Sequence, residues 1–281
     1  MERKQFIVLC LAVFMSLPFV SCGNDEESAE PVKNKEGLPF NPSGTFNGER
    51  LKSVDKIIFS YNENGYVNSI KNTNSLYNEW TENYTFSDDM KDVRKDVQGG
   101  GSPGTYSMTY NSLGYVQSIS WTGDQTWRDG RSKQWEFTYD KEGHLLTISM
   151  GGSLGSALYT FVWKDGCLMK GGRGVNATSG YSNVYDFSYF AKIKNVTLQY
   201  DYNMAKMLYE PFFQYLAYLG YMGKGSIYLP DDCRSTISQE EGDISINKPW
   251  TPQEGRIKYT FTDKGALKSE VTNMVINYIY E

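Results

Sequence analysis

Histidine and clustered cysteine are scarce in this chain of 281 residues, which contains one histidine and four dispersed cysteines. A zinc site needs several Cys, His or carboxylate ligands held together, and a serine–histidine pair needs a histidine beside its nucleophile. The only histidine, His144, occupies one position of the repeated motif described below, which favours a structural role. We therefore expect no metal, no cofactor, no catalytic residues and no enzyme activity.

Clusters of basic residues are also missing from the sequence. The chain has 28 Lys and Arg residues against 33 Asp and Glu residues, a formal net charge of −5 at pH 7. Nucleic-acid-binding proteins present a basic face to the phosphates, so we expect no nucleic acid partner. The same charge balance argues against electrostatic binding to anionic lipid.

Long hydrophobic runs are absent apart from one at the start of the chain. Residues 6–20 are almost wholly apolar and follow Arg3 and Lys4. A transmembrane helix needs roughly 20 apolar residues, so this run is short for a span. A basic start, an apolar core and the small residue Ser21 are typical of a secretory signal. We predict a signal peptide over residues 1–21.

The residue that follows, Cys22, indicates a lipid anchor. Ser21 and Cys22 resemble the bacterial lipobox, whose cysteine becomes the first mature residue and carries acyl chains. The alternative is an ordinary signal peptide with a bystander cysteine. Residues 22–50 are polar and begin with acids, and they lack the apolar surface that folding requires, so we expect a flexible acidic tether.

The acids directly behind Cys22 resemble the surface-export signal of Bacteroidetes lipoproteins. This resemblance implies an outer-membrane protein that faces the cell surface, with the periplasmic face as the alternative. Several acyl chains would anchor the protein without a spanning helix, because each buried CH₂ contributes roughly 0.8 kcal/mol.

The body of the chain repeats a β-hairpin motif five times. Each copy has an alternating aromatic strand, a polar turn that closes on glycine, and a second strand. The copies cover residues 57–70, 106–119, 135–148, 159–169 and 257–270, and their glycines are Gly65, Gly114, Gly143, Gly166 and Gly265. Glycine adopts positive φ at no steric cost, which suits the left-handed end of a hairpin turn.

The distances between the copies vary, so we predict an antiparallel meander and not a solenoid. The expected fold is mainly β, a curved sheet or partly open barrel in a single domain over residues 51–281. One detail departs from simple alternation, since Val67 and Ile70 stand two and five positions after Gly65. Either a β-bulge intervenes, or the second strand is covered on both faces.

Residues 203–223 break the strand pattern. They are dense in Met, Leu, Phe and Tyr without alternation, which predicts a helical segment. Proline starts a helix but cannot continue one, so Pro211 divides the segment, and Gly220 and Gly223 are candidate stops. A helix that is apolar nearly all round is buried, so we expect it to fill the concave side of the sheet. The alternative is a helix that enters lipid or a partner.

Two cysteines remain in the body of the chain, Cys167 and Cys233. In an oxidising compartment two cysteines could pair. Because nothing in the sequence brings them together, we favour two separate apolar fillers.

The acid-led lipobox, the aromatic hairpins and the segment after the helix together resemble an uncharacterised Bacteroidetes lipoprotein family, a domain of unknown function. Its hairpins are similar to those of YD-repeat proteins. It also carries a Gly-Lys-x-Ser-x-x-Leu-Pro element, which corresponds here to Gly223, Lys224, Ser226, Leu229 and Pro230. The resemblance implies a secreted, mainly antiparallel β protein and brings no known activity.

The candidate ligand-binding residues are Trp121, Trp127 and Arg128. Two tryptophans with polar neighbours can stack a sugar ring and bind its hydroxyls. The alternative is a hairpin whose tryptophans cover its own core. Our leading hypothesis is therefore a non-enzymatic envelope lipoprotein that binds a glycan or another envelope component. The second hypothesis is a lipid or lipoprotein carrier, or an assembly partner, that holds an apolar guest in the curved sheet.

Overall fold

A computed structural model describes most of the chain after the tether. The described residues are 41, 50–73, 81–99, 102–124, 133–151, 158–173, 181–196, 200–208, 210–239, 255–264, 266–271 and 275–280. All of them belong to one compact unit, Lys33–Glu281. The predicted signal peptide, Cys22 and nearly all of the tether lie outside the described residues.

The fold is mainly β, as predicted. The strands up to the helices are β1 (Leu51–Val54), β2 (Ile57–Tyr61), β3 (Val67–Asn72), β4 (Thr81–Phe86), β5 (Asp92–Gln98), β6 (Gly104–Tyr110), β7 (Val116–Gly123), β8 (Lys133–Tyr139), β9 (Leu145–Gly151), β10 (Leu158–Lys164), β11 (Cys167–Arg173), β12 (Tyr181–Ser188) and β13 (Ile193–Lys194). After the helices follow β14 (Tyr228–Leu229), β15 (Asp232–Gln239), β16 (Gly255–Arg256), β17 (Lys258–Phe261), β18 (Leu267–Val271) and β19 (Val275–Tyr280).

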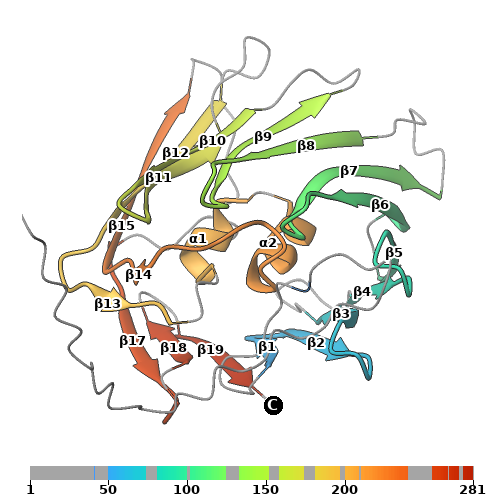
Figure 1. The fold of residues 1–281 in the computed structure, drawn as a ribbon, viewed down its shortest axis with the longest axis horizontal. Helices are drawn as coiled ribbons and strands as arrows, with labels where there is room; N and C mark the ends of the chain where they lie inside the picture. Colours follow the sequence, from blue (N-terminus) through green and yellow to red (C-terminus); the bar gives the residue numbers. More distant parts are fainter. Residues whose placement is uncertain are drawn as a thin grey trace, which may run out of the picture. The chain divides into compact units, whose positions relative to one another are not determined.

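The strands form an antiparallel meander (Figure 1). From β1 to β12 each strand pairs with the next, and β12 then pairs with β15 and β15 with β16. Strand β17 pairs with β18, β18 with β19, and β19 with β1, so the first and last strands are neighbours. Ile257 interrupts the chain between β16 and β17, and the sheet is curved but not closed into a barrel.

The hairpin turns share one geometry. In the β2–β3 turn the Asn62 Oδ1 accepts hydrogen bonds from the backbone N–H groups two and four residues on, both at 3.0 Å. Gly65 in this turn has φ 79°, a value that glycine adopts without strain. Asn111 and Asp140 make the same bonds in the β6–β7 and β8–β9 turns. The fifth turn glycine, Gly265, lies outside the described residues.

A β-bulge follows each turn. Tyr61 pairs with Val67, but the next pair is Ser60 with Ser69, so β3 contains one extra residue. Equivalent shifts occur in the β6–β7, β8–β9, β10–β11 and β17–β18 pairs. The extra residue returns the chain to the same face, so Val67 and Ile70 are both buried. The bulge, and not double coverage of the strand, explains the spacing of three.

Aromatic side chains near the turns bind the backbone of the preceding hairpin or strand. The Tyr139 hydroxyl donates to the Val116 carbonyl at 2.6 Å, and the Trp163 indole Nε1–H donates to the Leu145 carbonyl at 2.7 Å. Four tyrosine hydroxyls do the same: Tyr61 to Leu51, Tyr110 to Met90, Tyr189 to Leu168 and Tyr259 to Pro230. We call these bonds the aromatic clips.

The predicted helical segment forms two short helices, α1 (Tyr202–Lys206) and α2 (Pro211–Tyr218). Pro211 is the first residue of α2, as predicted. The helix ends earlier than the apolar run because Gly220 has φ 80°. Its N–H donates to the Ala217 carbonyl at 3.0 Å and the next N–H donates to the Leu216 carbonyl at 2.8 Å, which is a Schellman ending.

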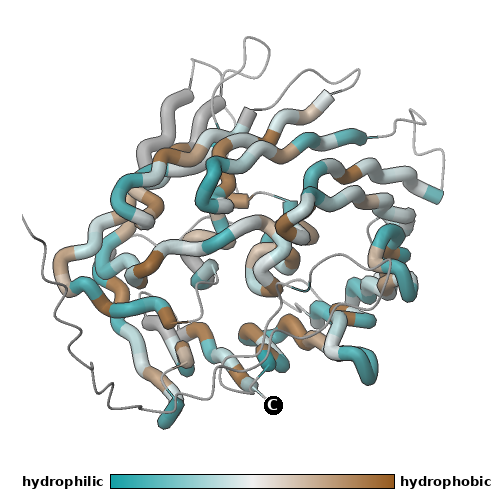
Figure 2. Tube along the Cα trace, in the orientation of Figure 1, coloured by the Kyte–Doolittle hydropathy of each residue, from teal (hydrophilic) through white to brown (hydrophobic). Residues whose placement is uncertain are grey.

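Helix α2 fills the inner side of the sheet (Figure 1), as predicted, and is buried with the apolar faces of the strands (Figure 2). Phe212 stacks on Tyr84 and Tyr106, with ring centroids 5.3 and 4.3 Å apart. Phe213 meets Trp135 and Phe137 edge-on, at 5.2 and 5.3 Å. Among the described residues, neither helix has the length and apolarity needed to cross a membrane.

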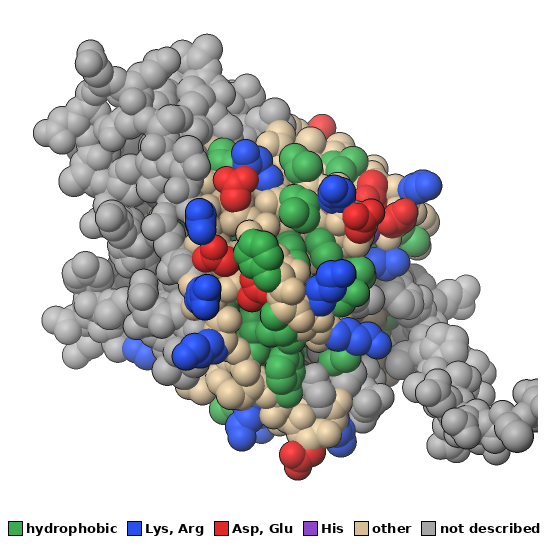
Figure 3. Space-filling model, turned by 90° about the vertical axis from the view of Figure 1, so that its left-hand side faces the viewer, with side chains coloured by type: hydrophobic (Ala, Val, Ile, Leu, Met, Phe, Trp, Pro, Cys, Tyr) green, Lys and Arg blue, Asp and Glu red, His purple; other side chains and the backbone are tan. Residues whose placement is uncertain are grey.

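Residues 219–230, which we call the strap, run from α2 across three consecutive hairpin turns. The Tyr221 carbonyl accepts from the Val116 N–H at 2.9 Å. The Lys224 N–H donates to the Gly143 carbonyl at 2.9 Å, and farther on a strap N–H donates to the Gly166 carbonyl at 3.0 Å. The strap contains the Gly-Lys-x-Ser-x-x-Leu-Pro element and reaches β14, on the side of the molecule drawn in Figure 3.

Gly223 lets the strap approach the β8–β9 turn, and its replacement is the first test of this contact. Its φ is 94°, and an added Cβ would lie 2.6 Å from the Gly143 carbonyl oxygen. We expect Gly223→Ala to lower the free energy of unfolding by about 2 kcal/mol or more, from backbone strain and the clash. Urea denaturation followed by circular dichroism measures the change.

The matched control is Gly151→Ala, because no atom lies within 4 Å of the position that its Cβ would take. This variant should change the free energy of unfolding by less than about 0.5 kcal/mol. Equal stabilities of the two variants would contradict the close approach of the strap.

Two buried tyrosines test the aromatic clips against each other. Tyr139→Phe removes a clip and leaves the Val116 carbonyl without its donor, which should cost about 1–3 kcal/mol. Tyr200 is 2 % exposed, and its hydroxyl has no hydrogen-bond partner among the described residues. Tyr200→Phe should therefore leave the stability unchanged or raise it. A similar loss in both variants would show that the hydroxyl bond adds nothing.

Candidate functional site

The sheet has two unlike edges. At the turn edge the hairpins close on their glycines and the strap crosses them. At the opposite edge, which we call the loop edge, neighbouring hairpins are joined, as where Gly123 ends β7 and Lys133 begins β8. The sequence-predicted residue Trp121 lies near the loop edge, in register with Tyr106 and Lys133.

Trp121 rests against the backbone of its own hairpin. A Cβ added to Gly104 would lie 2.8 Å from the Trp121 Nε1, and one added to Gly123 would lie 2.7 Å from its ring. Only glycine at both positions leaves room for the indole. The side chain is nevertheless partly exposed, packed against the rim of the core. The other two predicted ligand-binding residues, Trp127 and Arg128, lie outside the described residues.

Charged groups stand at the same edge as Trp121. The Lys133 Nζ lies 5.6 Å from the centroid of the Trp121 ring and 6.0 Å from that of Trp135. Arg94 donates from Nη1 to the Asp124 Oδ1 at 2.6 Å, and this hydrogen bond lowers the pKa of the Asp124 carboxyl. The sequence analysis missed Lys133, although it stands two residues before Trp135, where strand alternation puts it on the same face.

Asp140, Glu142 and His144 form a group with the spacing of metal ligands, all within 4.8 Å of one another. The Asp140 Oδ1 accepts two backbone N–H bonds, and its Oδ2 lies 2.9 Å from the His144 Nδ1. Burial acts to raise the pKa of Asp140, but these hydrogen bonds lower it overall. His144 is 5 % exposed and stacks on Trp163 at 4.4 Å. Because both Asp140 oxygens are engaged in the turn, the group is best explained as part of the hairpin.

A buried polar network joins the sheet to α2. The Lys95 Nζ lies 2.6 Å from the Glu82 Oε1, and the Tyr84 hydroxyl donates to the Glu82 Oε2 at 3.0 Å. Asn72 donates to the Tyr215 hydroxyl of α2 at 2.7 Å. Burial, followed by the nearby tyrosine and carboxylate groups, raises the pKa of Tyr84 well above its usual value. The hydroxyl therefore stays protonated as a donor, which suits a role in orienting α2.

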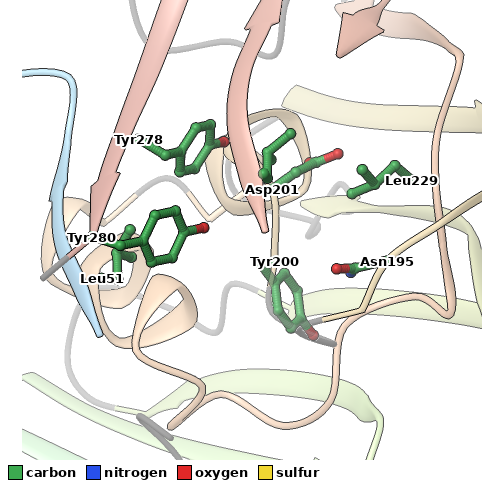
Figure 4. Close-up of a pocket in the computed structure, with 8 residues that line it drawn as sticks. Leu51, Asn195, Tyr200, Asp201, Leu229, Tyr278 and Tyr280 are labelled. Carbon is green, nitrogen blue, oxygen red and sulfur yellow. The ribbon is translucent and has the colours of Figure 1, made fainter. Parts of the chain in front are cut away.

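The interior contains a cavity of about 10 Å³ (Figure 4). This volume is about that needed for one water molecule. Its lining residues are Leu51, Asn195, Tyr200, Asp201, Leu229, Leu267, Tyr278 and Tyr280. The Asp201 carboxylate beside it already accepts bonds from the Met204 N–H and the Tyr259 hydroxyl. The cavity is too small for a lipid or a sugar.

Lys206 is an amine buried at the end of α1, with 8 % of its surface exposed. Its Nζ donates to the Gln214 Oε1 at 2.9 Å. Burial lowers the pKa of Lys206 to about 8, and the charge of Asp55 opposes the shift only in part. The amine is closed off from substrates, so it acts on stability and not on chemistry.

The lowered pKa of Lys206 makes stability depend on pH. Between about pH 8 and 10.5 the unfolded chain holds the proton and the folded chain releases it, so stability rises with pH. We expect this lysine to contribute a rise on the order of 1–2 kcal/mol between pH 7 and 9.5. Lys206→Met should abolish that rise. Urea midpoints of both proteins at the two pH values measure it, and parallel pH profiles would contradict it.

No known protein family model matches the chain, and no curated protein sequence does so either. The chain is similar in fold to a solved structure described as a porin-like protein from Bacteroides uniformis. The TM-score is 0.56 at 14 % identity, and the likeness covers 80 % of this chain and 89 % of the other. At this identity the likeness shows the fold, and the resemblance to a Bacteroidetes lipoprotein family stays a prediction.

Proposed function

We propose that this protein is a non-enzymatic binding protein of the cell envelope, held by acylated Cys22, and that it binds a glycan at the loop edge around Trp121. The observation that carries the proposal is the filled interior. Helix α2 and the strap are buried inside the curved sheet, and the cavity that remains there has about 10 Å³. A ligand must therefore bind on the outside.

The filled interior counts against the carrier hypothesis. An apolar guest in the curved sheet would have to displace side chains such as Phe212 and Leu216, which are fully buried. Such residues give up their transfer free energy when they leave the core, about 1.5–3 kcal/mol each. Release of the segment as a lid would also break its backbone bonds to the Gly143 and Gly166 turns.

Trp121 offers the chemistry that sugars require on an outer edge. Its indole is partly exposed and is held in one place by Gly104 and Gly123. Lys133 adds a cation beside the ring, which can bind sugar hydroxyls or a uronate carboxylate. A likeness in fold to a protein described as porin-like from a Bacteroides species agrees with an envelope protein.

A glycan array tests the proposal, with a chain of residues 23–281 that lacks the acylated cysteine and keeps all described residues. The array should carry neutral and uronate-containing glycans. We expect binding that Trp121→Ala lowers roughly tenfold or more, since aromatic contacts are strong anchors in interfaces. Trp127→Ala should weaken binding in the same assay.

The control is Trp121→Phe, which keeps an aromatic ring over the same glycines and should retain part of the binding. Urea midpoints of each variant separate lost binding from lost folding. A flat array, or binding unchanged in both Trp121→Ala and Trp127→Ala, would reject the sugar site.

A further inference from the structure

Phe190 is an apolar side chain held out into solvent on a bonded loop. Its ring is 83 % exposed, the largest value among the described large apolar residues. The loop around it is fixed, because Tyr189 donates to the Leu168 carbonyl at 2.7 Å and the Ala191 N–H donates to the Asp231 Oδ2. An exposed aromatic ring on a fixed backbone is typical of a contact surface.

Other apolar side chains lie beside this loop. Ile227 of the strap is 39 % exposed, and its N–H is bonded to the Gly166 carbonyl of the β10–β11 turn. Ile193 of β13 is partly exposed and pairs with Leu229 of the strap. Figure 3 shows this side of the molecule, with apolar side chains in the middle and Lys and Arg side chains around them.

Exposed lysines from four places in the sequence surround these apolar residues. They are Lys164, Lys192, Lys194 and Lys224. The acids beside them are Asp165, which is exposed, and Asp231, whose carboxylate is engaged by the Ala191 N–H. We call Phe190, Ile193, Ile227 and the four lysines the turn-edge patch. It is locally cationic although the whole chain is acidic.

Local charge decides how a protein meets a charged surface. Charges more than about 10 Å away are screened at an ionic strength of 0.1 M. The net charge of −5 argues against binding to anionic lipid, but most of that charge lies beyond this range from the patch. A cationic surface with a central aromatic ring has the composition of an interfacial membrane contact.

The N-terminal tether reaches the described domain at this same edge. Asn41 donates from Nδ2 to the Gly65 carbonyl at 3.0 Å, and its Oδ1 accepts from the Tyr221 hydroxyl of the strap at 3.3 Å. Only 19 residues lead from Cys22 to Asn41. A chain spans at most about 3.5 Å per residue, so Asn41 stays within about 65 Å of the cysteine.

We propose that the turn-edge patch docks on the anionic lipid surface of the membrane that carries Cys22. The proposal rests on the lipid anchor of the proposed function. Phe190 enters the headgroup layer and the lysines meet the lipid phosphates. The tether keeps the patch close to that surface, which raises its effective concentration there.

Vesicle flotation tests the patch without the anchor, using the chain of residues 23–281. We expect it to float with phosphatidylcholine vesicles that contain about one third phosphatidylglycerol, and to float less at about 1 M salt, where screening is stronger. Each Lys→Gln change at Lys192 or Lys194 should lower the partition coefficient about fivefold. Phe190→Ser should lower it roughly tenfold.

The matched controls are Lys71→Gln and Ile58→Ser, which alter an exposed lysine and an exposed apolar residue on β3 and β2. Both should bind vesicles like the unaltered chain. No flotation, equal flotation with uncharged vesicles, or binding unaffected by Phe190→Ser would overturn the proposal. A dimer in sedimentation velocity that Phe190→Ser dissolves would instead assign the patch to a second copy.

Labelling with radioactive palmitate in cells tests the anchor separately. Label that depends on Cys22 supports the proposed function, whereas flotation of the chain without Cys22 reports only on the patch. Absence of label together with salt-sensitive flotation would reject the anchor and leave a membrane-docking surface.

Discussion

The aromatic clip is the contact on which the rest of this structure depends. A two-stranded hairpin alone is at best marginally stable, and each hairpin here ends in a bulge where the ladder is irregular. The Tyr139 hydroxyl and the Trp163 indole donate to backbone carbonyls of the hairpin before, next to those bulges. The bond fixes one hairpin to the next, and it also directs the aromatic rings inward. The same side chains therefore join the meander and line its interior.

A lined interior still has to be filled, and the chain does this with its own helical segment. Large aromatic residues bury 150–250 Å² each, so the rings of Phe212 and Phe213 account for much of the contact with the sheet. The strap then ties the segment to the turns through backbone bonds that no side-chain substitution can remove. Such a closed interior leaves the outer edges as the surfaces where recognition can occur.

Much of this fold could be predicted from the sequence, because hairpins carry local signals. The turn glycines, the aromatic alternation and the spacing of three after each glycine all follow from contacts within about fifteen residues, and Pro211 divides the helices where it stands. The clips and the strap could not be predicted, since the Tyr139 hydroxyl or the Lys224 N–H gives no sign in sequence of which carbonyl it meets. The turn-edge patch escaped for the same reason: its lysines come from separate segments. Trp121 was found as a ring, but its glycine seat depends on the register of β6 with β7.

The two edges of the sheet differ in a way that follows from how the hairpins are built. Tight turns need glycine and fixed hydrogen bonds, so the turn edge is short, rigid and crossed by the strap. The loop edge has no such constraint, and loops on a rigid scaffold commonly carry binding residues. The tether joins the turn edge through Asn41, so an anchor at Cys22 draws that edge toward the membrane. Trp121 lies at the opposite edge, and the strands between the edges then act as a spacer that holds a ligand away from the lipid.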